Sequence, residues 1–209
     1  MSFDPIAALT DRQREQLSQY AAELARVNKR FNLVAPSTLR DVERVHLRHS
    51  LALSWRPFPS GATVVDWGAG GGLPTVPLAI AFPETRFVAV DSVGKKMEAV
   101  RLFARRLGLE NLDVWNGRAE RYDGPLPHYA VSRATAPLAT LWGWTERVRQ
   151  PLAEVPAEAW TPGLYTLKGG DLTEEIAALP DGLAVETTPL TDILGPGDET
   201  KALVAVRPA

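Results

Sequence analysis

A short glycine-rich stretch between two apolar segments constrains the fold of this chain more than any other feature. Residues 64–74 read VVDWGAGGGLP and residues 87–91 read FVAVD, so Asp91 follows Gly72 by nineteen residues. An apolar strand, a glycine turn, a short helix and a second strand ending in a carboxylate are typical of a nucleoside-binding α/β domain. The glycines let backbone N–H groups approach a ligand, and the acid accepts hydrogen bonds from ribose hydroxyls.

The glycine spacing indicates which nucleoside cofactor this turn would hold. A dinucleotide site has the pattern G-x-G-x-x-G/A, whose third small residue lets the helix pack closely while its N-terminus faces a pyrophosphate. Here Gly68, Gly70 and Gly72 form G-x-G-x-G, and Leu73 fills the position of the small residue. This pattern argues against the dinucleotide site of a nicotinamide dehydrogenase. The turn also contains no lysine, which argues against a P-loop. It favours a cofactor that lacks phosphate, of which S-adenosylmethionine is the common one.

Strand-like and helix-like segments alternate along residues 61–209, which we predict to form the catalytic domain. The predicted parallel strands are 63–66, 86–91, 112–116, 129–132 and 164–168. The predicted helices are 74–82, 95–107, 138–150 and 172–179. Segments 184–188 and 203–207, joined by a glycine- and proline-rich turn at 195–198, are predicted to close as an antiparallel pair. The expected fold is α/β and Rossmann-like, with a mainly parallel seven-stranded sheet covered on both faces.

Residues 1–60 are predicted to form a helical extension before that domain. Residues 10–13, TDRQ, have the pattern of a capping box, and Leu17, Tyr20 and Leu24 then recur at helical spacing towards Phe31. A second helical segment is predicted from about residue 39 to residue 53, after a turn near residues 36–37.

The charges are distributed unevenly, although the net charge is only −2. Residues 26–48 contain six Lys or Arg against two acids, and residues 95–106 contain five against one. Residues 171–200 contain eight acids and no Lys or Arg. This polarity suggests one face that meets a polyanion such as RNA, with residues 1–60 contributing to it, although solvated helix faces would give the same counts.

Composition excludes several other classes of protein. The 209 residues, 45% of them hydrophobic, suffice for one compact enzyme domain. The chain has no cysteine, which excludes disulfides and a cysteine nucleophile. No run is long enough to span a membrane and no signal peptide is recognisable, so we expect a cytoplasmic protein. His46 and His49 lack a nearby carboxylate constellation, so no metal is expected, and nothing requires more than a monomer.

Five motifs in a fixed order give the chain a specific resemblance to one enzyme family. They are VDWGAGGGLP at 65–74, DSVGKK at 91–96, GRAE at 117–120, VSRA at 131–134 and LKG at 167–169. This set resembles the ribosomal RNA small subunit methyltransferase G family, also called glucose-inhibited division protein B. The resemblance runs from about Tyr20 to the C-terminus. It implies a Rossmann-like enzyme that transfers a methyl group from S-adenosylmethionine to N7 of one guanine in 16S ribosomal RNA.

The resemblance assigns cofactor contacts to the glycine turn and to the second strand. Gly68 and Leu73 match positions on the methionine and ribose side of S-adenosylmethionine. Gly70 gives the close backbone approach. Asp91 matches the acid that holds the ribose hydroxyls. Each assignment is an expectation about where the cofactor lies relative to the first two strands.

Later motifs complete the expected site. Ala119 and Glu120 match the family's adenine-side contact, and Arg133 matches the arginine at the mouth shared by cofactor and substrate. Lys168 is a candidate for an RNA phosphate contact, or a residue that merely caps its strand. Glu120 as a surface acid and Arg133 as a strand-end ion pair are the alternative interpretations.

The sequence departs from the family pattern at four positions. The family usually has proline where Gly71 stands and glycine where Thr75 stands, and an Asp-Ser pair where Ala52 and Leu53 stand. These departures bear on loop geometry and cofactor affinity more than on the reaction. They also leave open the alternative that the chain is a non-catalytic, RNA-binding relative of this family. A methyltransferase that acts on a small molecule or a protein is a further alternative.

The expected chemistry needs no general base. Guanine N7 carries an in-plane lone pair and no proton, so it attacks the sulfonium methyl directly, and catalysis rests on alignment. The absence of cysteine excludes covalent C5-pyrimidine methylation. Residues 132–135 read SRAT rather than the Asn/Asp-Pro-Pro-aromatic motif of amino-group methylation. We therefore predict no catalytic acid or base and a positioning role for Arg133, with 7-methylguanosine as the product.

Overall fold

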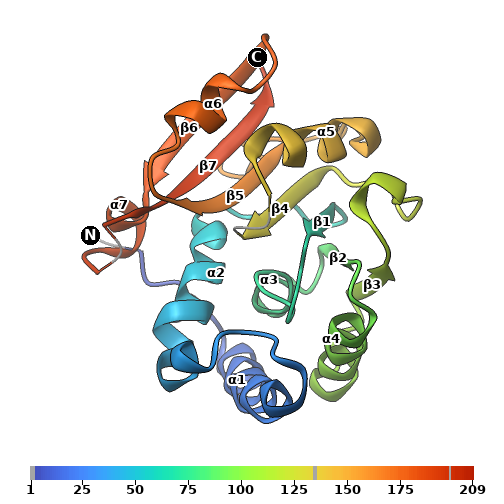
Figure 1. Ribbon diagram of the computed structural model, residues 1–209, viewed down its shortest axis with the longest axis vertical. Helices are drawn as coiled ribbons and strands as arrows, with labels where there is room; N and C mark the ends of the chain where they lie inside the picture. The colour runs from blue at the N-terminus through green and yellow to red at the C-terminus, as the bar shows by residue number, and fades with distance from the viewer. Residues whose placement is uncertain (1–2, 134–135, 198) are drawn as a thin grey trace.

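One seven-stranded sheet forms the centre of the molecule (Figure 1). The computed structural model describes residues 3–133, 136–197 and 199–209. The strands are β1 (Thr63–Trp67), β2 (Arg86–Asp91), β3 (Leu112–Asn116), β4 (Tyr129–Arg133), β5 (Leu164–Gly169), β6 (Leu183–Pro189) and β7 (Lys201–Pro208). Their order across the sheet is β3-β2-β1-β4-β5-β7-β6.

Strand direction places the functional loops at one edge. β1 lies between β2 and β4, and the five strands β1 to β5 run parallel to one another. β7 runs antiparallel to both β5 and β6. The order reverses direction at β1, and in open α/β sheets ligands bind beyond the carboxyl ends of the strands at such a switch point. The sheet confirms the predicted fold class.

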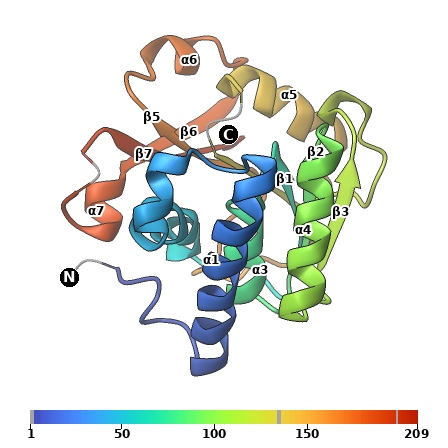
Figure 2. The same ribbon diagram turned by 60° about the horizontal axis from the view of Figure 1, so that its bottom comes forward.

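Helices flank the sheet and connect its strands. The helical elements are α1 (Asp11–Phe31), η1 (Pro36–Asp41), η2 (Glu43–Arg48), α2 (His49–Leu51), η3 (Ala52–Trp55), α3 (Thr75–Ala81), α4 (Gly94–Leu107), η4 (Ala119–Arg121), α5 (Leu138–Val148), α6 (Thr173–Ala177) and α7 (Leu190–Leu194). Figure 2 shows α1 alongside α3 and α4 on one side, with α5 and α6 on the other.

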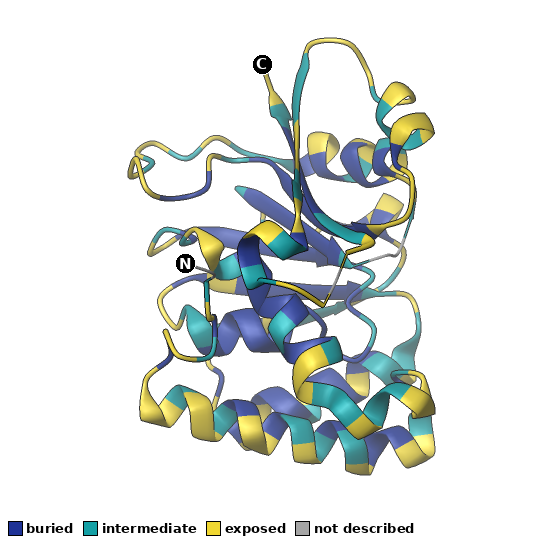
Figure 3. Ribbon diagram, turned by 90° about the vertical axis from the view of Figure 1, so that its left-hand side faces the viewer, coloured by how far each residue is buried: buried dark blue, intermediate teal, exposed yellow. Residues whose placement is uncertain are grey.

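Alternation along the strands divides the core into two layers. Val64 packs in the cluster that contains residues of α1, α3 and α4. Val65 and Trp67 face the opposite layer, where Leu138 and Trp142 of α5 pack. Successive strand residues point to opposite faces, so an apolar run such as that of β1 indicates a strand covered on both sides. Figure 3 shows the buried strands between helices with exposed outer faces.

Helix α1 forms as its sequence predicts. The Thr10 side chain accepts a hydrogen bond from the Gln13 N–H at 3.3 Å, and Gln13 Oε1 accepts from the Thr10 N–H at 2.9 Å, which confirms the capping box. Leu17, Tyr20 and Leu24 are buried. Burial of one such apolar side chain stabilises the fold by roughly 1.5–3 kcal/mol. The buried stripe therefore attaches the N-terminal segment firmly to the sheet domain.

Several predicted boundaries need correction. The expected helix at 39–53 is instead a succession of a 3-10 helix (η1), a π-helix (η2), one α turn (α2) and a second 3-10 helix (η3). Apolar periodicity does not distinguish these helix types here, because each run of at most six residues is too short to define a repeat. The connection between β6 and β7 contains α7, which was not predicted. Ala134 and Thr135 of the SRAT motif and Asp198 of the 195–198 turn lie outside the described residues.

Candidate active site

The glycine turn after β1 has the conformation that its sequence predicts. Gly68, Gly70 and Gly72 all have positive φ, of 75°, 56° and 90°. A Cβ on Gly72 would lie 2.6 Å from Val76 Cγ2, so only glycine allows α3 to approach the turn this closely. The N–H groups of Gly68 and Ala69 both donate to the Val90 carbonyl at 2.9 Å, which fixes the start of the turn against β2.

Asp91 connects the glycine turn to the loop that follows β2. Its Oδ2 accepts from the Gly70 N–H at 3.1 Å, and its Oδ1 accepts from the Val93 N–H at 2.8 Å. A carboxylate oxygen accepts two hydrogen bonds, so each oxygen retains capacity for one more donor. The side chain is partly exposed and lines a cavity. It therefore holds the loop and still has acceptor capacity at the cavity.

A cavity of about 170 Å³ lies at the carboxyl ends of β1, β2 and β3. Four of the predicted cofactor residues line it: Gly68, Asp91, Ala119 and Glu120. Gly117 borders the same cavity, and a Cβ there would lie 2.3 Å from the ring of Trp115. Ala119 is buried at the start of η4, whereas Glu120 is exposed. The structure thus brings together residues from three predicted motifs around one small cavity.

Arg133 and Lys168 line a second cavity, of about 330 Å³, beyond the ends of β4 and β5. His46 and His49 from the N-terminal segment and Lys201 from β7 complete its polar lining. The wall is basic, with three cationic side chains. The N-terminal segment and the sheet domain therefore form this cavity together.

The amino group of Lys168 has partners within the protein. It donates to Glu175 Oε2 at 2.7 Å and to the Ala136 carbonyl at 2.6 Å, and the side chain is only 8% exposed. Burial opposes ionisation of Glu175, but hydrogen bonds from Lys168 and from the Leu138 N–H outweigh it and lower the pKa of Glu175. An RNA phosphate would have to compete with this ion pair, and the substrate role of Lys168 stays a prediction.

Arg133 is held by a neutral histidine. Its Nη1 lies 3.1 Å from His46 Nδ1, and His46 Nε2 lies 2.7 Å from Thr38 Oγ1. A guanidinium only donates, so Nδ1 accepts and the imidazole carries its proton on Nε2, which donates to Thr38. Burial, together with the positive charge of Arg133, lowers the pKa of His46 to about 4. The histidine therefore stays neutral at physiological pH and orients Arg133.

Comparison with known protein families identifies the family of this chain. The model of the family described as rRNA small subunit methyltransferase G matches residues 13–195. The chain belongs to this family. A relative named ribosomal RNA small subunit methyltransferase G from Salinibacter ruber is 51% identical, over 99% of this chain and 98% of the relative.

Solved structures show the same fold at low sequence identity. Precorrin-6y C5,15-methyltransferase from Geobacter metallireducens has a TM-score of 0.59 at 14% identity, over 77% of this chain and 87% of that chain. Fibrillarin from Aeropyrum pernix, solved with bound S-adenosylmethionine, has a TM-score of 0.58 at 16% identity, over 77% and 74%. The fold of this rRNA small subunit methyltransferase G family member is therefore that of the Rossmann-like methyltransferases.

The two remaining predicted cofactor residues of the glycine turn do not line either cavity of this family member. Gly70 lies in the turn held by Asp91, and Leu73 is buried, 4% exposed, among residues of the N-terminal layer. Trp67 is fully buried and its Nε1 donates to Thr145 Oγ1 at 3.0 Å, so it packs in the core as expected.

Sequence reasoning missed a buried carboxylate beneath the glycine turn. Asp66 on β1 is 0% exposed, and its Oδ2 accepts a hydrogen bond from the Thr75 hydroxyl. Its burial, opposed in part by the hydrogen bonds from Thr75 and the charge of Arg133, raises its pKa to about 7. An acid within an otherwise apolar strand was the available signal, because such groups are buried only with specific partners.

A second missed contact joins α1 to the glycine turn. The Tyr20 hydroxyl donates to the Gly71 carbonyl at 2.8 Å, and both groups are buried. Burial raises the pKa of Tyr20, so the hydroxyl remains a donor. A Cβ on Gly71 would lie 3.0 Å from Leu33 Cβ, so the N-terminal segment packs directly on the turn. The departure at Gly71 coincides with this close approach.

Removal of the Tyr20 hydroxyl is expected to affect both stability and cofactor binding. Tyr20→Phe leaves the buried Gly71 carbonyl without its donor, which should lower the free energy of unfolding by about 1–2 kcal/mol and weaken binding of S-adenosylmethionine. Tyr129→Phe is the matched control, because the Tyr129 hydroxyl also donates to a buried carbonyl, that of Trp160 at 2.7 Å, at the opposite end of the sheet. Denaturant unfolding and calorimetric titration of both variants test this. Equal affinities in the two variants would contradict the role of Tyr20.

Metal-binding clusters and membrane-spanning helices are both absent from the described residues. Among the residues that the structure describes, no group of three or more His, Cys, Asp or Glu side chains could hold a metal ion. No helix in the described part of the chain is both long and apolar enough to cross a membrane. The expectation that no metal is needed stays a prediction.

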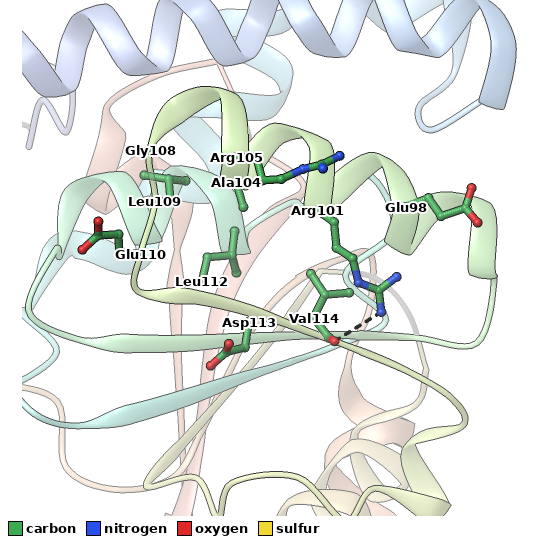
Figure 4. Close-up of a pocket in the computed structure, with 10 residues that line it drawn as sticks. All are labelled: Glu98, Arg101, Ala104, Arg105, Gly108, Leu109, Glu110, Leu112, Asp113 and Val114. Atoms are coloured by element: carbon green, nitrogen blue, oxygen red, sulfur yellow. Dashed lines mark hydrogen bonds between the residues drawn. The ribbon is translucent and has the colours of Figure 1, made fainter.

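A separate groove lies between α4 and the edge strand β3 (Figure 4). It measures about 910 Å³ and shares no lining residue with the two cavities at the strand ends. Arg101 points from α4 toward β3, whereas Arg105 points away from that strand, and Glu98, Glu110 and Asp113 also line the groove. These opposite charges offset one another, so the groove lacks the uniformly positive surface that a polyanion requires.

Proposed function

We propose that this protein transfers a methyl group from S-adenosylmethionine to N7 of a guanine in 16S ribosomal RNA. Family membership along almost the whole chain carries the proposal. The cavity at the ends of β1, β2 and β3 supports it, because glycine backbone, a ribose-accepting acid and an apolar η4 residue meet there. The small subunit of the ribosome is the proposed partner and the cytoplasm the proposed location.

The residues present fit the cofactor from its adenosine end to its methionyl end. Asp91 would hold the ribose hydroxyls, while Ala119 and Glu120 would contact the adenine. Gly68, Gly70 and Leu73 would border the ribose and methionine side. At the methionyl end we propose the Asp66 carboxyl and the Arg133 guanidinium, whose charges influence each other's pKa. One acid and one cation match the ammonium and carboxylate of an amino-acid group.

The proposed reaction relies on placement rather than on proton transfer. When bound, S-adenosylmethionine supplies an electrophilic methyl group on a sulfonium. The protein has to align the guanine with that methyl group and exclude water, since N7 has no proton to lose. Arg133, held by His46 at the boundary of the second cavity, is the residue we propose for this alignment.

We further infer a division of labour along the chain. Residues 61–209 form the cofactor-binding domain, and residues 1–60 form an RNA-facing extension. The support is the basic excess in residues 26–48 and the contribution of His46 and His49 to the second cavity. Arg133 and Lys168 are the proposed substrate contacts. The protein is proposed to act as a monomer.

A methyl-transfer assay tests the proposed function. Small ribosomal subunits from cells that lack this protein are incubated with it and with labelled S-adenosylmethionine, and the digested nucleosides are separated. Label in 7-methylguanosine supports the cofactor, the substrate and the reaction together. Cofactor binding without label would favour a small-molecule or protein substrate. Absence of cofactor binding would favour a non-catalytic RNA-binding role.

The affinity for S-adenosylmethionine is expected to depend on pH through Asp66. The folded state raises its pKa from 3.8 to about 7, and an ammonium group binds the ionised form. Affinity should therefore fall by up to about tenfold per pH unit below pH 7 and level off above it.

The stability of the cofactor-free protein changes with pH in the opposite sense to the affinity. In the unfolded chain the Asp66 carboxyl loses its proton near pH 4, whereas in the folded protein it keeps the proton until about pH 7. Asp66 therefore contributes to the free energy of unfolding at low pH, and this contribution disappears as the pH rises towards 7.

Calorimetric titration between about pH 5.5 and about pH 8.5 measures this dependence. Asp66→Asn is the control, because an amide of the same shape does not titrate. Its affinity should be lower and flat over the acidic range. An equally steep acidic fall in the variant would assign the titration to another group.

A further inference from the structure

The two oxygens of the buried Asp66 carboxyl differ in their surroundings. Oδ2 accepts from the Thr75 hydroxyl, and the Thr75 backbone N–H also donates to the carboxyl. Oδ1 is buried and has no hydrogen-bond partner among residues 3–133, 136–197 and 199–209. A buried acceptor without a donor is costly, and native structures rarely leave one without a functional reason. The arrangement therefore points to a donor that arrives with a ligand.

The groups that face Asp66 come from every element packed around it. Arg133 approaches from β4, Asp91 from β2 and Tyr20 from α1, while Thr75 occupies the first turn of α3. Among these side chains Arg133 is cationic, and it also donates to His46. Thr75 is the residue that donates a side-chain hydrogen bond to the acid. The ionised state of Asp66 thus depends on one hydroxyl and one nearby positive charge.

We propose that Thr75 is a positioning residue for the cofactor, whose hydroxyl occupies Asp66 Oδ2 and leaves Oδ1 to accept from the ammonium group at the methionyl end of S-adenosylmethionine. This inference rests on the proposed function. Thr75 does not touch the cofactor and acts through Asp66. The Thr75 side chain is fully buried, so its hydroxyl serves the interior of the protein rather than the solvent.

The Thr75 hydroxyl matters because it affects the charge state of the Asp66 carboxyl. A hydrogen bond donated to a carboxylate favours the ionised form, and without it burial favours the neutral acid. A neutral carboxyl carries a proton on one oxygen and attracts an ammonium group far less than a carboxylate does. Loss of the Thr75 hydroxyl should therefore weaken recognition of the methionyl end while the adenosine end is recognised as before.

Two substitutions and two ligands isolate this effect. Thr75→Val keeps the size and shape of the side chain and removes the hydroxyl, whereas Thr75→Ser keeps the hydroxyl and serves as the matched control. Each variant is titrated calorimetrically with S-adenosylmethionine and with 5′-methylthioadenosine, which has the adenosine and sulfur but neither the ammonium nor the carboxylate. Each titration is repeated at about pH 7 and about pH 8.5, on either side of full ionisation of Asp66.

The expected result is a selective loss. Thr75→Val should weaken S-adenosylmethionine binding about tenfold at neutral pH, the loss of one charge-assisted hydrogen bond, and leave methylthioadenosine binding unchanged. The loss should shrink at the higher pH, and Thr75→Ser should bind as the wild type does. Equal losses for both ligands would show a general disturbance of the glycine turn and overturn the inference, as would no loss for either.

The outcomes separate this inference from the proposed function. If the wild-type protein binds S-adenosylmethionine and Thr75→Val binds it equally well, the role of Thr75 is wrong and the methyltransferase proposal stands. If the wild-type protein binds no S-adenosylmethionine, the proposed function is wrong and the inference about Thr75 is wrong with it.

Discussion

Asp91→Asn is expected to weaken S-adenosylmethionine binding by about a hundredfold or more. The carboxylate joins the glycine turn to the β2–α4 loop through the Gly70 and Val93 N–H groups, at 3.1 and 2.8 Å. An asparagine offers one oxygen and one NH2 group, so one of these two N–H groups would face another donor. The ribose hydroxyls would also lose a charged acceptor. Loss of about 3 kcal/mol from these terms corresponds to a hundredfold change in affinity.

Calorimetric titration of the variant measures this effect. Asp113→Asn is the matched control, because Asp113 lies on the neighbouring strand β3, is half exposed and pairs with Arg86 at 2.7 Å on the surface. Its substitution should change neither affinity nor stability measurably, since exposed ion pairs contribute little. If Asp91→Asn binds the cofactor within about threefold of the control, the ribose-holding role of Asp91 is wrong.

The parts of the site that depend on near neighbours in sequence were predictable. Gly68, Gly70, Gly72 and Asp91 belong to one strand-turn-helix-strand unit, whose geometry is set by local conformation and by the parallel pairing of β1 with β2. The capping box of α1 is equally local. Residues of this kind carry their structural reason in their own spacing, so the sequence suffices to place them.

Contacts between distant segments were not predictable from the same patterns. Helical spacing indicates that Tyr20 faces the core, but not that its hydroxyl reaches the Gly71 carbonyl, fifty-one residues away. Likewise, His46 and Arg133 are eighty-seven residues apart. For Lys168, the sequence suggested either a phosphate contact or a strand cap, and neither prediction included the hydrogen bond that its amino group donates to Glu175. Side-chain partners across a fold follow from tertiary packing, which periodicity does not encode.

These distant contacts have a common property. Tyr20 and His46 both belong to residues 1–60, and each bonds a group of the sheet domain that is proposed to hold the cofactor. The segment we propose to face RNA is thereby in direct contact with the glycine turn and with Arg133. Displacement of that segment on RNA binding would alter both contacts, so cofactor and RNA affinities should be coupled, and reciprocally so.

Arg133→Met should lower kcat/KM for methyl transfer by at least about a hundredfold. Methionine retains an unbranched side chain of similar reach without the charge. The guanidinium supports ionisation of Asp66, and burial, opposed by Tyr20 and Asp66, lowers the pKa of Arg133 itself. Its removal would leave Asp66 more readily protonated and the methionyl carboxylate without a cation. Both the affinity for S-adenosylmethionine and the turnover should therefore fall.

Arg101→Met controls for the loss of an arginine as such. Arg101 lies on the exposed face of α4, with its Nη2 3.5 Å from the Val114 carbonyl, and belongs to neither cavity at the strand ends (Figure 4). Affinity, turnover and thermal unfolding are measured for both variants, so that a loss of activity is separated from a loss of fold. If Arg133→Met binds the cofactor and methylates small subunits as Arg101→Met does, Arg133 has no positioning role. Alignment at the second cavity would then have to come from other polar groups of its wall, such as Lys168, His49 or Lys201.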